Sequence, residues 1–414
     1  MAAAVGTGLF RAITVSPPLH GIVKHEPGVK PAHHCGTNGC FTNPWPSFRE
    51  RPRWNMFFSV LSNQIRNMPK VPDNISSLIP ASTPNWGMGE NVNSIKATWL
   101  GHACYLIELP TPAGATRGAR IILDPALSHR CFSSEYLGPG RITPVPCKTE
   151  EIPEVDAIVL SHNHYDHTDT KSLQKLVKQH NAHVFAPLGN RPYLESCSIP
   201  HSNIHIFDWW ESSQITVDLP SSAKSDSSSE GHNQSSTVQA TFKVICTPCQ
   251  HFSGRSANDR AKTLWASWAI EEILSSPSIP GSGDGEARAP KKIWFGGDTG
   301  YRTVFDGENE DDVPVCPAFK EIGEKIGPFD FAMIPIGAYD PRSLFSSVHA
   351  SPKDSVAIFK DVKAKKALAM HWGTWILTTE PIMDPPRLLK EECHKSGVPE
   401  GDFDICGLGE TRFF

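Results

Sequence analysis

Three histidines and two aspartates, side chains of types that bind metals, stand close together in VLSHNHYDHTD, residues 159–169. His162 and His164 are two positions apart, and Asp166 and His167 follow them. Alternate residues of a β-strand lie on one face, so His162 and His164 are expected to converge on one point. A turn after them would carry Asp166 and His167 to a second point. Imidazole and carboxylate suit Zn²⁺, so the spacing predicts two zinc ions side by side.

Three more ligand-type residues follow apolar segments farther along the chain. His251 follows FKVICTPCQ, Asp298 follows KIWFGG, and His371 follows KALAM. Polar residues directly after the strands of a sheet meet at a common edge, so we expect these three to join the cluster. Two zinc ions about 3.5–4 Å apart can generate a hydroxide nucleophile and stabilise a leaving oxygen, which is the chemistry of ester hydrolysis.

The charge balance favours a local anionic substrate over nucleic acid. Lys and Arg number 39 against 44 Asp and Glu, and the net charge is −5. The chain-wide basic surface of a nucleic-acid-binding protein is therefore missing, and we expect no nucleic-acid partner. Two Zn²⁺ ions against the carboxylates of Asp166 and Asp298 leave a focused positive charge, which suits a phosphodiester or another anionic ester.

Short β-rich segments that alternate with helical ones are expected to position these residues. From Ala97 onward the β-rich segments are ATWLGHACYLIEL, ARIILDPAL, VDAIVLSHNH, ATFKVICTPCQH, KKIWFGGDTGY, FDFAMIPIGAY and KKALAMHWGTW. Residues 169–181 and 351–362 have helical composition between such segments. This interleaving predicts an α/β architecture in which helices cover sheets.

We expect one catalytic domain over residues 41–414. Residues 1–40 are rich in Pro, Gly and His and lack periodicity, which predicts a mobile or targeting segment. Near 220–238 and 274–290 the chain is rich in Ser and Gly and is expected to form surface insertions. Residues 1–25 contain basic but no acidic residues, a composition compatible with a mitochondrial presequence and equally with a plain disordered N-terminus.

The 11 cysteines form no dense, even framework, and no secretory signal opens the chain, so we expect a reducing, intracellular setting. Cys246 and Cys249 have the Cys-x-x-Cys spacing but no second pair, and we assign them no chemistry. No run approaches the roughly 18 apolar residues of a membrane-spanning helix.

An aromatic and basic stretch, residues 45–70, is the candidate for contact with a membrane surface. Its apolar residues fall at helical spacing: Trp54, Phe57, Phe58, Leu61, Ile65 and Met68. Arg and Lys around such a stripe suit lipid headgroups, and peripheral membrane binding is one interpretation. Packing of the stripe against the body of the protein is the other.

The motif HNHYDH has the pattern His-x-His-x-Asp-His and resembles the signature of the metallo-β-lactamase superfamily. The resemblance implies an αββα sandwich with metals at one edge of its two sheets. Thiolesterases, lactonases, tRNA-processing nucleases and phospholipases share the motif, so it indicates the fold better than the substrate.

Further segments resemble one family, the N-acyl-phosphatidylethanolamine-hydrolysing phospholipases D. They are NPWPSF, TWLGHACYLIE, LSHNHYDHTD, APLGN, DWWE, FGGDTGYR, IPIGAYDPR, HASPKDSV and AMHWGTW. The resemblance covers most of the chain from residue 43 to 375, but neither the Ser/Gly-rich insertions nor residues 1–40. It implies hydrolysis of an N-acylated phospholipid at a membrane surface to an N-acylethanolamine and phosphatidic acid.

The family also implies a role for each site residue. One zinc would be held by His162, His164 and His251, the other by Asp166, His167 and His371, with Asp298 bridging the two. His349, in SSVHASPKDSV, matches a family histidine near the scissile phosphate, where it could orient the phosphoryl group or pass a proton to the leaving alkoxide. The alternative is that His349 is a surface histidine at the start of a helix, without a catalytic role.

Several alternatives stay open at the level of sequence. Asp169 is expected to cap the following helix or to support a metal ligand, and His102 and His129 are expected to be structural. The same fold could hydrolyse a soluble phosphodiester or a lactone, carry a diiron redox centre, or bind lipid or protein without catalysis. The oligomeric state is open, with a homodimer among the alternatives.

Overall fold

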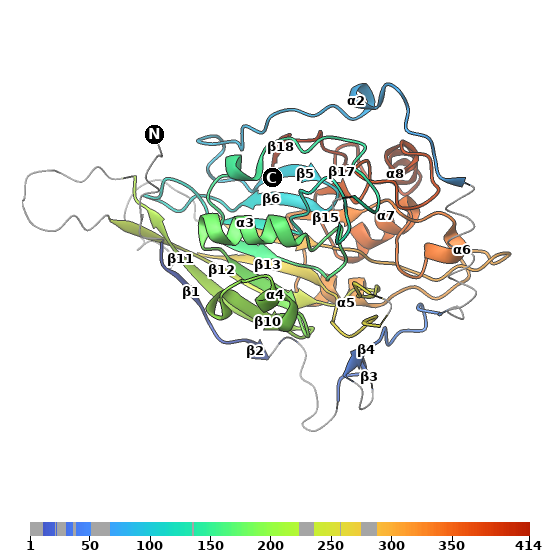
Figure 1. Ribbon diagram of the computed structural model, residues 1–414, viewed down its shortest axis with the longest axis horizontal. Helices are drawn as coiled ribbons and strands as arrows, with labels where there is room; N and C mark the ends of the chain where they lie inside the picture. The colour runs from blue at the N-terminus through green and yellow to red at the C-terminus, as the bar shows by residue number, and fades with distance from the viewer. Residues whose placement is uncertain are drawn as a thin grey trace, which may run out of the picture.

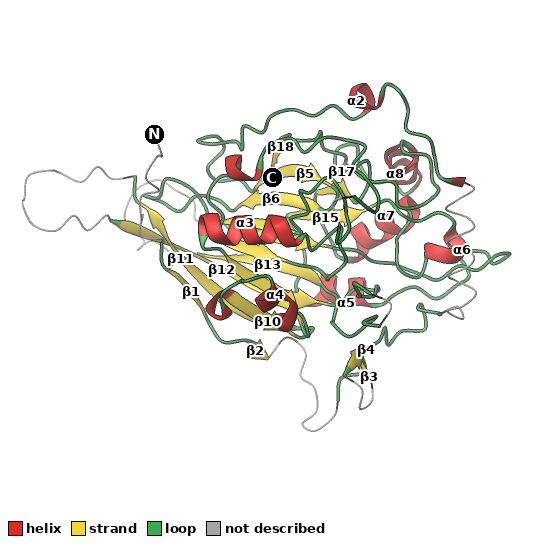
Figure 2. Ribbon diagram, in the orientation of Figure 1, coloured by secondary structure: helices red, strands yellow, loops and turns green. Residues whose placement is uncertain are grey.

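The computed structural model has two large β-sheets packed face to face, with helices on their outer sides (Figure 1). It describes residues 11–20, 22, 30–35, 39–50, 67–134, 136–222, 236–256, 258–274 and 288–414. Figure 2 shows the strands of both sheets running through the centre of the molecule and the helices at its periphery. All seven β-rich segments predicted from the sequence contain a strand of these sheets.

The larger sheet has the order β1-β11-β12-β13-β14-β15-β16-β17, with β2 also beside β11. Its strands are β1 Ile13–Val15, β2 Leu19–His20, β11 Glu211–Pro220, β12 Thr237–Thr247, β13 Ser267–Ile273, β14 Lys292–Phe295, β15 Phe331–Pro335, β16 Ala367–Met370 and β17 Phe403–Asp404. Strands β14, β15, β16 and β17 pair in parallel in this order, whereas β13 pairs antiparallel with both β12 and β14. Strands β12, β14 and β16 therefore run in the same direction and end at the same edge.

The smaller sheet has the order β10-β9-β8-β7-β6-β5-β18. Its strands are β5 Lys96–Gly101, β6 Cys104–Glu108, β7 Arg120–Leu123, β8 Ala157–Val159, β9 His183–Pro187, β10 Ile204–Phe207 and β18 Thr411–Phe413. A separate hairpin consists of β3 His34–Cys35 and β4 Cys40–Phe41.

Both faces of the smaller sheet are buried, because its strands present apolar side chains alternately to the two sides. On one side Tyr105 and Leu123 share a core with Trp268 and Phe242 of the larger sheet. On the other side lies a second core, which includes Leu106. Each such fully buried apolar side chain contributes about 1.5–3 kcal/mol, and the two cores account for the layered arrangement.

The described helices are α2 Ile75–Leu78, α3 Thr170–His180, α4 Arg191–Ser196, α5 Ala318–Lys325, α6 Arg342–Phe345, α7 Pro352–Asp361 and α8 Asp384–Lys395, with short 3₁₀ turns η1 Thr149–Glu151 and η2 His201–Asn203. Helices α3 and α4 pack on the outer side of the smaller sheet. Helix α7 packs on the larger sheet and against α5 and α8. This is the predicted αββα sandwich, and the fold prediction is confirmed.

Helix α3 starts directly after the metal-ligand motif, and the sequence explains its limits. The Asp169 carboxylate accepts a hydrogen bond from the backbone N–H of Lys171 at 3.2 Å, so the predicted cap is confirmed. Leu173, Leu176 and Val177 follow at the spacing of one helix face and are buried. Asn181 ends the helix in the left-handed conformation, with φ 52°.

Some of the predicted segments lie outside the described residues. These are residues 51–66, which contain most of the aromatic stripe, and the central parts of both Ser/Gly-rich insertions, 223–235 and 275–287. Among the described residues, no helix is long and apolar enough to cross a bilayer. Within the N-terminal segment, β1 and β2 pair with β11.

Candidate metal centre

The HNHYDH motif lies in the loop between β8 and α3. Strand β8 ends at Val159, so the expectation that His162 and His164 lie on a strand is wrong. Beyond the strand, the Asp124 carboxylate accepts the N–H of Ser161 at 2.7 Å. The two imidazoles nevertheless converge, with Nε2 of His162 2.8 Å from Nδ1 of His164.

His251 completes a group of three histidines with His162 and His164. It follows β12, and its Nε2 lies 3.3 Å from Nδ1 of His164. Its other nitrogen, Nδ1, lies 2.9 Å from the carbonyl oxygen of Val348, which fixes the ring and leaves Nε2 facing the group. On the opposite side of the group, Ser161 Oγ lies 2.9 Å from Nδ1 of His162.

Asp166, His167 and His371 form a second group beside the first. The turn after His164 brings Oδ2 of Asp166 to 3.6 Å from Nε2 of His167. His371 follows β16 with φ 63°, and its Nε2 lies 3.7 Å from the same Asp166 oxygen. Loop residues after β8 and a residue after β16 thus meet although the two strands belong to different sheets.

Asp298 lies between the two groups. Its Oδ2 is 3.2 Å from Nε2 of His167 and 3.7 Å from Nε2 of His251, and its Oδ1 is 2.9 Å from Nε2 of His371. The chain reaches this position from β14 through Gly296 and Gly297. Gly297 has φ 58°, and a Cβ there would lie 2.6 Å from Cβ of Ser161, so only glycine fits between β14 and the motif loop.

Five polar atoms of this cluster are buried without hydrogen bonds: Nε2 of His167, both ring nitrogens of His371, Oδ1 of Asp298 and Nδ1 of His349. Nε2 of His371 and Oδ1 of Asp298 lie only 2.9 Å apart, yet their orientation does not make a hydrogen bond. A buried polar atom without a partner costs about 1–3 kcal/mol, so a cluster of them in native protein points to a bound ligand. Converging imidazole nitrogens and a carboxylate fit metal cations, and the ligand groups together with the fold imply metal ions.

The protonation states also fit metal binding. Burial lowers the pKa of His162 and His251 well below the ordinary value and that of His164 to about 4, so these imidazoles are neutral at pH 7. Burial alone would raise the pKa of Asp298, but His167 and His371 outweigh it and hold the carboxyl ionised. In return, and against the effect of burial, Asp298 and Asp166 raise the pKa of His167 well above its ordinary value and that of His371 to about 9. Metals bind neutral imidazole and ionised carboxylate, so a cation at the second group would displace a proton from each of these two histidines.

His349 faces the same carboxylate from the loop before α7. Its Nδ1 lies 3.8 Å from Oδ2 of Asp298, and its ring centroid is 5.2 Å from that of His251 and 5.3 Å from that of His371. The side chain is 14% exposed, which places it at the mouth of the cluster. Burial lowers its pKa to about 4, so His349 is neutral at pH 7.

Two residues of the cluster were not identified from the sequence. His102 was expected to be only structural, but its Nε2 lies 3.0 Å from Oδ2 of Asp166, and it belongs to the second group. Asp124, whose Oδ2 lies 2.6 Å from Nδ1 of His167, is not among the site residues predicted from the sequence. Asp124 directly follows the apolar run ARIIL, the same signal that identified Asp298.

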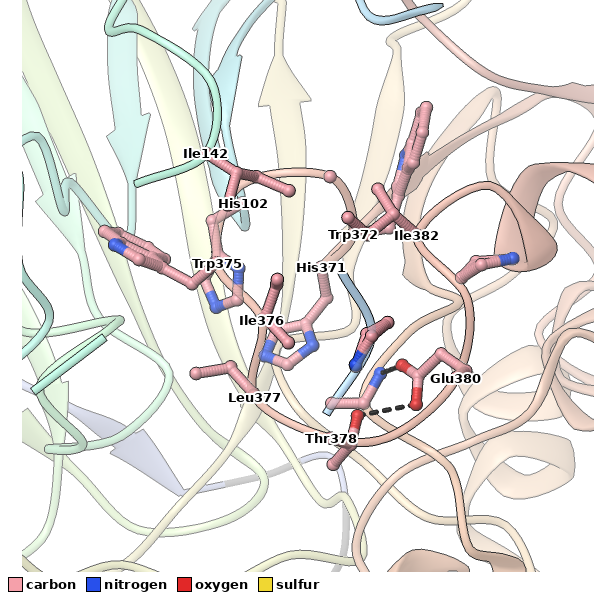
Figure 3. A pocket seen from close by; sticks show the side chains of 14 residues that line it. His102, Ile142, His371, Trp372, Trp375, Ile376, Leu377, Thr378, Glu380 and Ile382 are labelled. Carbon is pink, nitrogen blue, oxygen red and sulfur yellow. Dashed lines mark hydrogen bonds between the residues drawn. The ribbon is translucent and has the colours of Figure 1, made fainter. Parts of the chain in front are cut away.

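A small pocket, of about 30 Å³, opens beside His102 and His371 (Figure 3). Its walls include Ile142, Trp372, Trp375, Ile376, Leu377 and Ile382. The one acidic residue of the lining, Glu380, accepts hydrogen bonds at 2.6 Å from both the Thr378 hydroxyl and the N–H of Ala338. Its carboxylate is therefore satisfied by the protein, and the space left in the pocket is enough for about one water molecule.

A larger pocket, of about 780 Å³, lies beside the motif loop. Its lining includes Arg130, Tyr165, Lys171 and Arg255 together with several hydroxyl groups. The Arg255 guanidinium lies between the rings of Tyr165 and Tyr193, at 3.9 and 4.5 Å from their centroids. The same guanidinium donates hydrogen bonds to two carbonyl groups of the motif loop, so Arg255 fixes this loop from the side of the larger pocket.

Comparison with known proteins gives consistent matches. A family model described as the Beta-lactamase superfamily domain matches residues 119–372. N-acyl-phosphatidylethanolamine-hydrolyzing phospholipase D 1 of Caenorhabditis elegans is 30% identical over 361 residues, which cover 85% of each chain. The mitochondrial N-acyl-phosphatidylethanolamine-hydrolyzing phospholipase D of Saccharomyces cerevisiae is 26% identical over 91% of this chain and 76% of its own. Among solved structures, an isothiocyanate hydrolase from Delia radicum gut bacteria matches 77% of this chain and 99% of its own, with 17% identity and a TM-score of 0.48.

Proposed function

Because this chain belongs to the metallo-β-lactamase superfamily and, within it, to the family of N-acyl-phosphatidylethanolamine-hydrolysing phospholipases D, we propose that it hydrolyses N-acyl-phosphatidylethanolamine. The products would be an N-acylethanolamine and phosphatidic acid. The observation that carries the proposal is the position of Asp298, whose carboxylate contacts members of both ligand groups at one edge of the sheets.

We propose two zinc ions as the metals. His162, His164 and His251 would hold one ion, and Asp166, His167 and His371 the other, with Asp298 shared between them. Bound zinc would supply positive charge to the phosphate oxygens and an activated water as nucleophile. Nitrogen-rich ligand groups of this kind favour zinc over magnesium or calcium, which prefer oxygen.

His349 is proposed to act on the reacting phosphate. It is neutral at pH 7 and sits at the mouth of the cluster, facing Asp298. From there its imidazole could orient a phosphoryl oxygen and direct a proton to the leaving alkoxide. Asp298 and His349 are thus the two residues to which we assign roles at the reacting atoms.

The larger pocket beside the motif loop supports a substrate with an anionic, hydrogen-bonding portion. Its lining carries arginine, lysine and hydroxyl groups around Tyr165, and its volume is about 780 Å³. The phosphate and headgroup of a phospholipid supply such a portion. The pocket beside His371, of about 30 Å³, is too small for an acyl chain.

A lipid substrate requires contact with a membrane, and we propose that the protein is peripheral. The aromatic and basic stretch at residues 45–70 is the proposed contact. Deletion or charge reversal of this stretch should weaken binding to liposomes, and unchanged binding would exclude it. The mitochondrial assignment of the yeast relative makes mitochondria the first compartment to examine.

One assay tests the proposed activity. Purified full-length protein is incubated with micelles of N-acyl-phosphatidylethanolamine, and phosphatidic acid and N-acylethanolamine are measured by mass spectrometry. We expect both products in equal amounts from the wild type and none from Asp298→Asn. Asp404→Asn, which changes a half-exposed carboxylate outside the cluster, is the matched control and should keep full turnover.

Each other outcome counts against the proposal. Hydrolysis of soluble phosphodiesters or lactones but not of the lipid would favour a different hydrolase of the same fold. Lipid binding without hydrolysis by zinc-loaded protein would favour a noncatalytic lipid-binding module. Iron in the purified protein, together with redox activity, would favour the diiron alternative.

A further inference from the structure

A separate cluster of metal-ligand side chains lies where the β3–β4 hairpin, at the periphery of the molecule in Figure 1, meets the residue after β10. Nε2 of His33 lies 2.7 Å from Oδ1 of Asp208, and Nε2 of His34 lies 2.7 Å from Oδ2 of the same carboxylate. Ligand atoms of all three residues lie within 4.8 Å of one another. Neither histidine belongs to the candidate metal centre.

We propose that His33, His34 and Asp208 bind a further zinc ion, distinct from those of the candidate metal centre. Two imidazoles and one carboxylate are a zinc ligand set, and water can complete the tetrahedron. The His34 side chain is 23% exposed and that of His33 only 5%, so solvent reaches the site from the side of His34. Magnesium and calcium are disfavoured, because two of the three ligands are nitrogen.

The surroundings hold two of the three ligands in place. The His33 ring stacks on Trp209, with centroids 4.2 Å apart, and Trp209 stacks in turn on Trp45 at 5.4 Å. The backbone N–H of Trp209 donates to Oδ1 of Asp208 at 2.8 Å and fixes the carboxylate. Ligands whose rotamers are already set lose little entropy on binding, which raises metal affinity.

A metal ion at this place would connect the N-terminal hairpin to the candidate metal centre. It would join β3 to the end of β10, two segments about 170 residues apart in sequence. Directly after the hairpin, Nδ2 of Asn43 donates a 2.8 Å hydrogen bond to the carbonyl oxygen of His251. The ion would therefore have a structural role: it would stabilise the segment that supports His251, a proposed zinc ligand of the candidate metal centre.

The competing explanation is a pair of plain hydrogen bonds, in which each Nε2–H donates to one carboxylate oxygen. Metal content separates the two explanations. Full-length protein is saturated with Zn²⁺, freed of excess metal by gel filtration and measured by plasma mass spectrometry. We expect the wild type to hold one equivalent of zinc more than His34→Gln and one more than Asp208→Asn.

The matched control is His201→Gln. His201 also faces a single carboxylate, with Nδ1 2.7 Å from Glu195, but its side chain is 78% exposed, and within the part of the chain that the structure describes no second histidine joins it in a candidate site. This variant should retain the wild-type metal content. Equal zinc content in the wild type, His34→Gln and Asp208→Asn would overturn the proposal.

A second measurement does not depend on the stability of the hairpin variants. His162→Ala/His371→Ala removes one ligand from each group of the candidate metal centre. This double variant should keep one zinc equivalent, and adding His34→Gln should release it. A double variant without zinc would also overturn the proposal. This inference is independent of the proposed phospholipase activity. That activity is tested by product formation, whereas the hairpin site is tested by a zinc equivalent beyond the two of the candidate metal centre.

Discussion

Oδ2 of Asp124 lies 2.6 Å from Nδ1 of His167, and both side chains are completely buried. Asp124 follows β7 and His167 lies in the loop after β8, so the parallel pairing of these strands brings the residues together. Because the Asp124 carboxylate accepts a hydrogen bond from Nδ1, Nε2 is the nitrogen of His167 that faces Asp298. Asp124 thereby selects the nitrogen that His167 offers to a metal.

Asp124→Asn is expected to weaken metal binding by about 10–100-fold, because the neutral amide no longer orients His167 as a charged acceptor does. Competition with a chelating dye measures the affinity, and circular dichroism checks the fold. Asp169→Asn is the control, since Asp169 caps α3 beside the same loop without facing either ligand group. Equal affinities in Asp124→Asn and the wild type would show that this hydrogen bond has no role in metal binding.

Gly297→Ala should destabilise the protein and abolish its activity. The new Cβ would lie 2.6 Å from Cβ of Ser161, which forces apart β14 and the motif loop. Gly397→Ala is a matched control, because Gly397 also has a positive φ, 66°, but nothing within 4 Å of the added atom. Urea unfolding should give a loss of about 1 kcal/mol for Gly397→Ala, from backbone strain alone. Gly297→Ala should lose about 1–3 kcal/mol more from the steric clash, and equal losses would contradict this explanation.

Asp354→Asn is expected to cost about 3–5 kcal/mol of stability, because it breaks a buried ion pair network. The Asp354 carboxylate is completely buried, 2.8 Å from Nε of Arg302 and 2.6 Å from an amino group of Arg342, and in the capping box of α7 it accepts the backbone N–H of the N-cap residue Ser351. Asp311 also lies near Arg302, at 3.7 Å, but is 63% exposed. Asp311→Asn should therefore change stability by less than about 1 kcal/mol. Similar losses for both variants in urea unfolding would rule out this difference in burial as the cause.

The stacked pair His183 and His205 predicts a loss of stability in weak acid. Burial lowers the pKa of both residues to about 4, below the ordinary value of 6.5. Between these values the unfolded chain binds more protons than the folded protein, so stability falls as the pH drops from 6.5 to 4. Each residue contributes at most about 1.4 kcal/mol per pH unit in this window. His205→Phe, which can keep the stacking on Phe185, should flatten the dependence measured by urea unfolding at pH 7 and pH 5. An unchanged slope would contradict the assignment.

The local sequence pattern predicted the ligand residues themselves, but not the residues that contact and orient them. His251, Asp298 and His371 each end an apolar run, and the structure brings all three beside the motif, because strands β12, β14 and β16 end at one edge. The same pattern could have identified Asp124. No local pattern indicates that His102 meets Asp166, because that contact depends on how the turn between β5 and β6 packs against the motif loop.

The cluster of His33, His34 and Asp208 marks the limit of sequence reasoning. The histidines lie in a segment without periodicity, and Asp208 is 174 residues beyond His34. Their contact arises only when the hairpin packs against the end of β10. Long-range contacts of this kind depend on the packing of the whole fold, which no single stretch of sequence specifies.

His349→Ala should lower kcat by about 10²–10⁴-fold and leave the metal content unchanged. The imidazole lies at the mouth of the cluster, 3.8 Å from Asp298. It belongs to neither of the two groups proposed to hold zinc, although with His251 and Asp298 it forms a further set of three that could hold a metal ion. A residue that orients phosphate or transfers a proton affects the chemical step, whereas a surface histidine with a merely structural role would affect stability alone. Turnover of N-acyl-phosphatidylethanolamine, zinc content and melting temperature are measured on the same preparation. A fall in kcat with normal zinc content and melting temperature supports a role at the reacting phosphate. Unchanged kcat would show that His349 is not catalytic, and a parallel loss of zinc would make it a metal ligand instead.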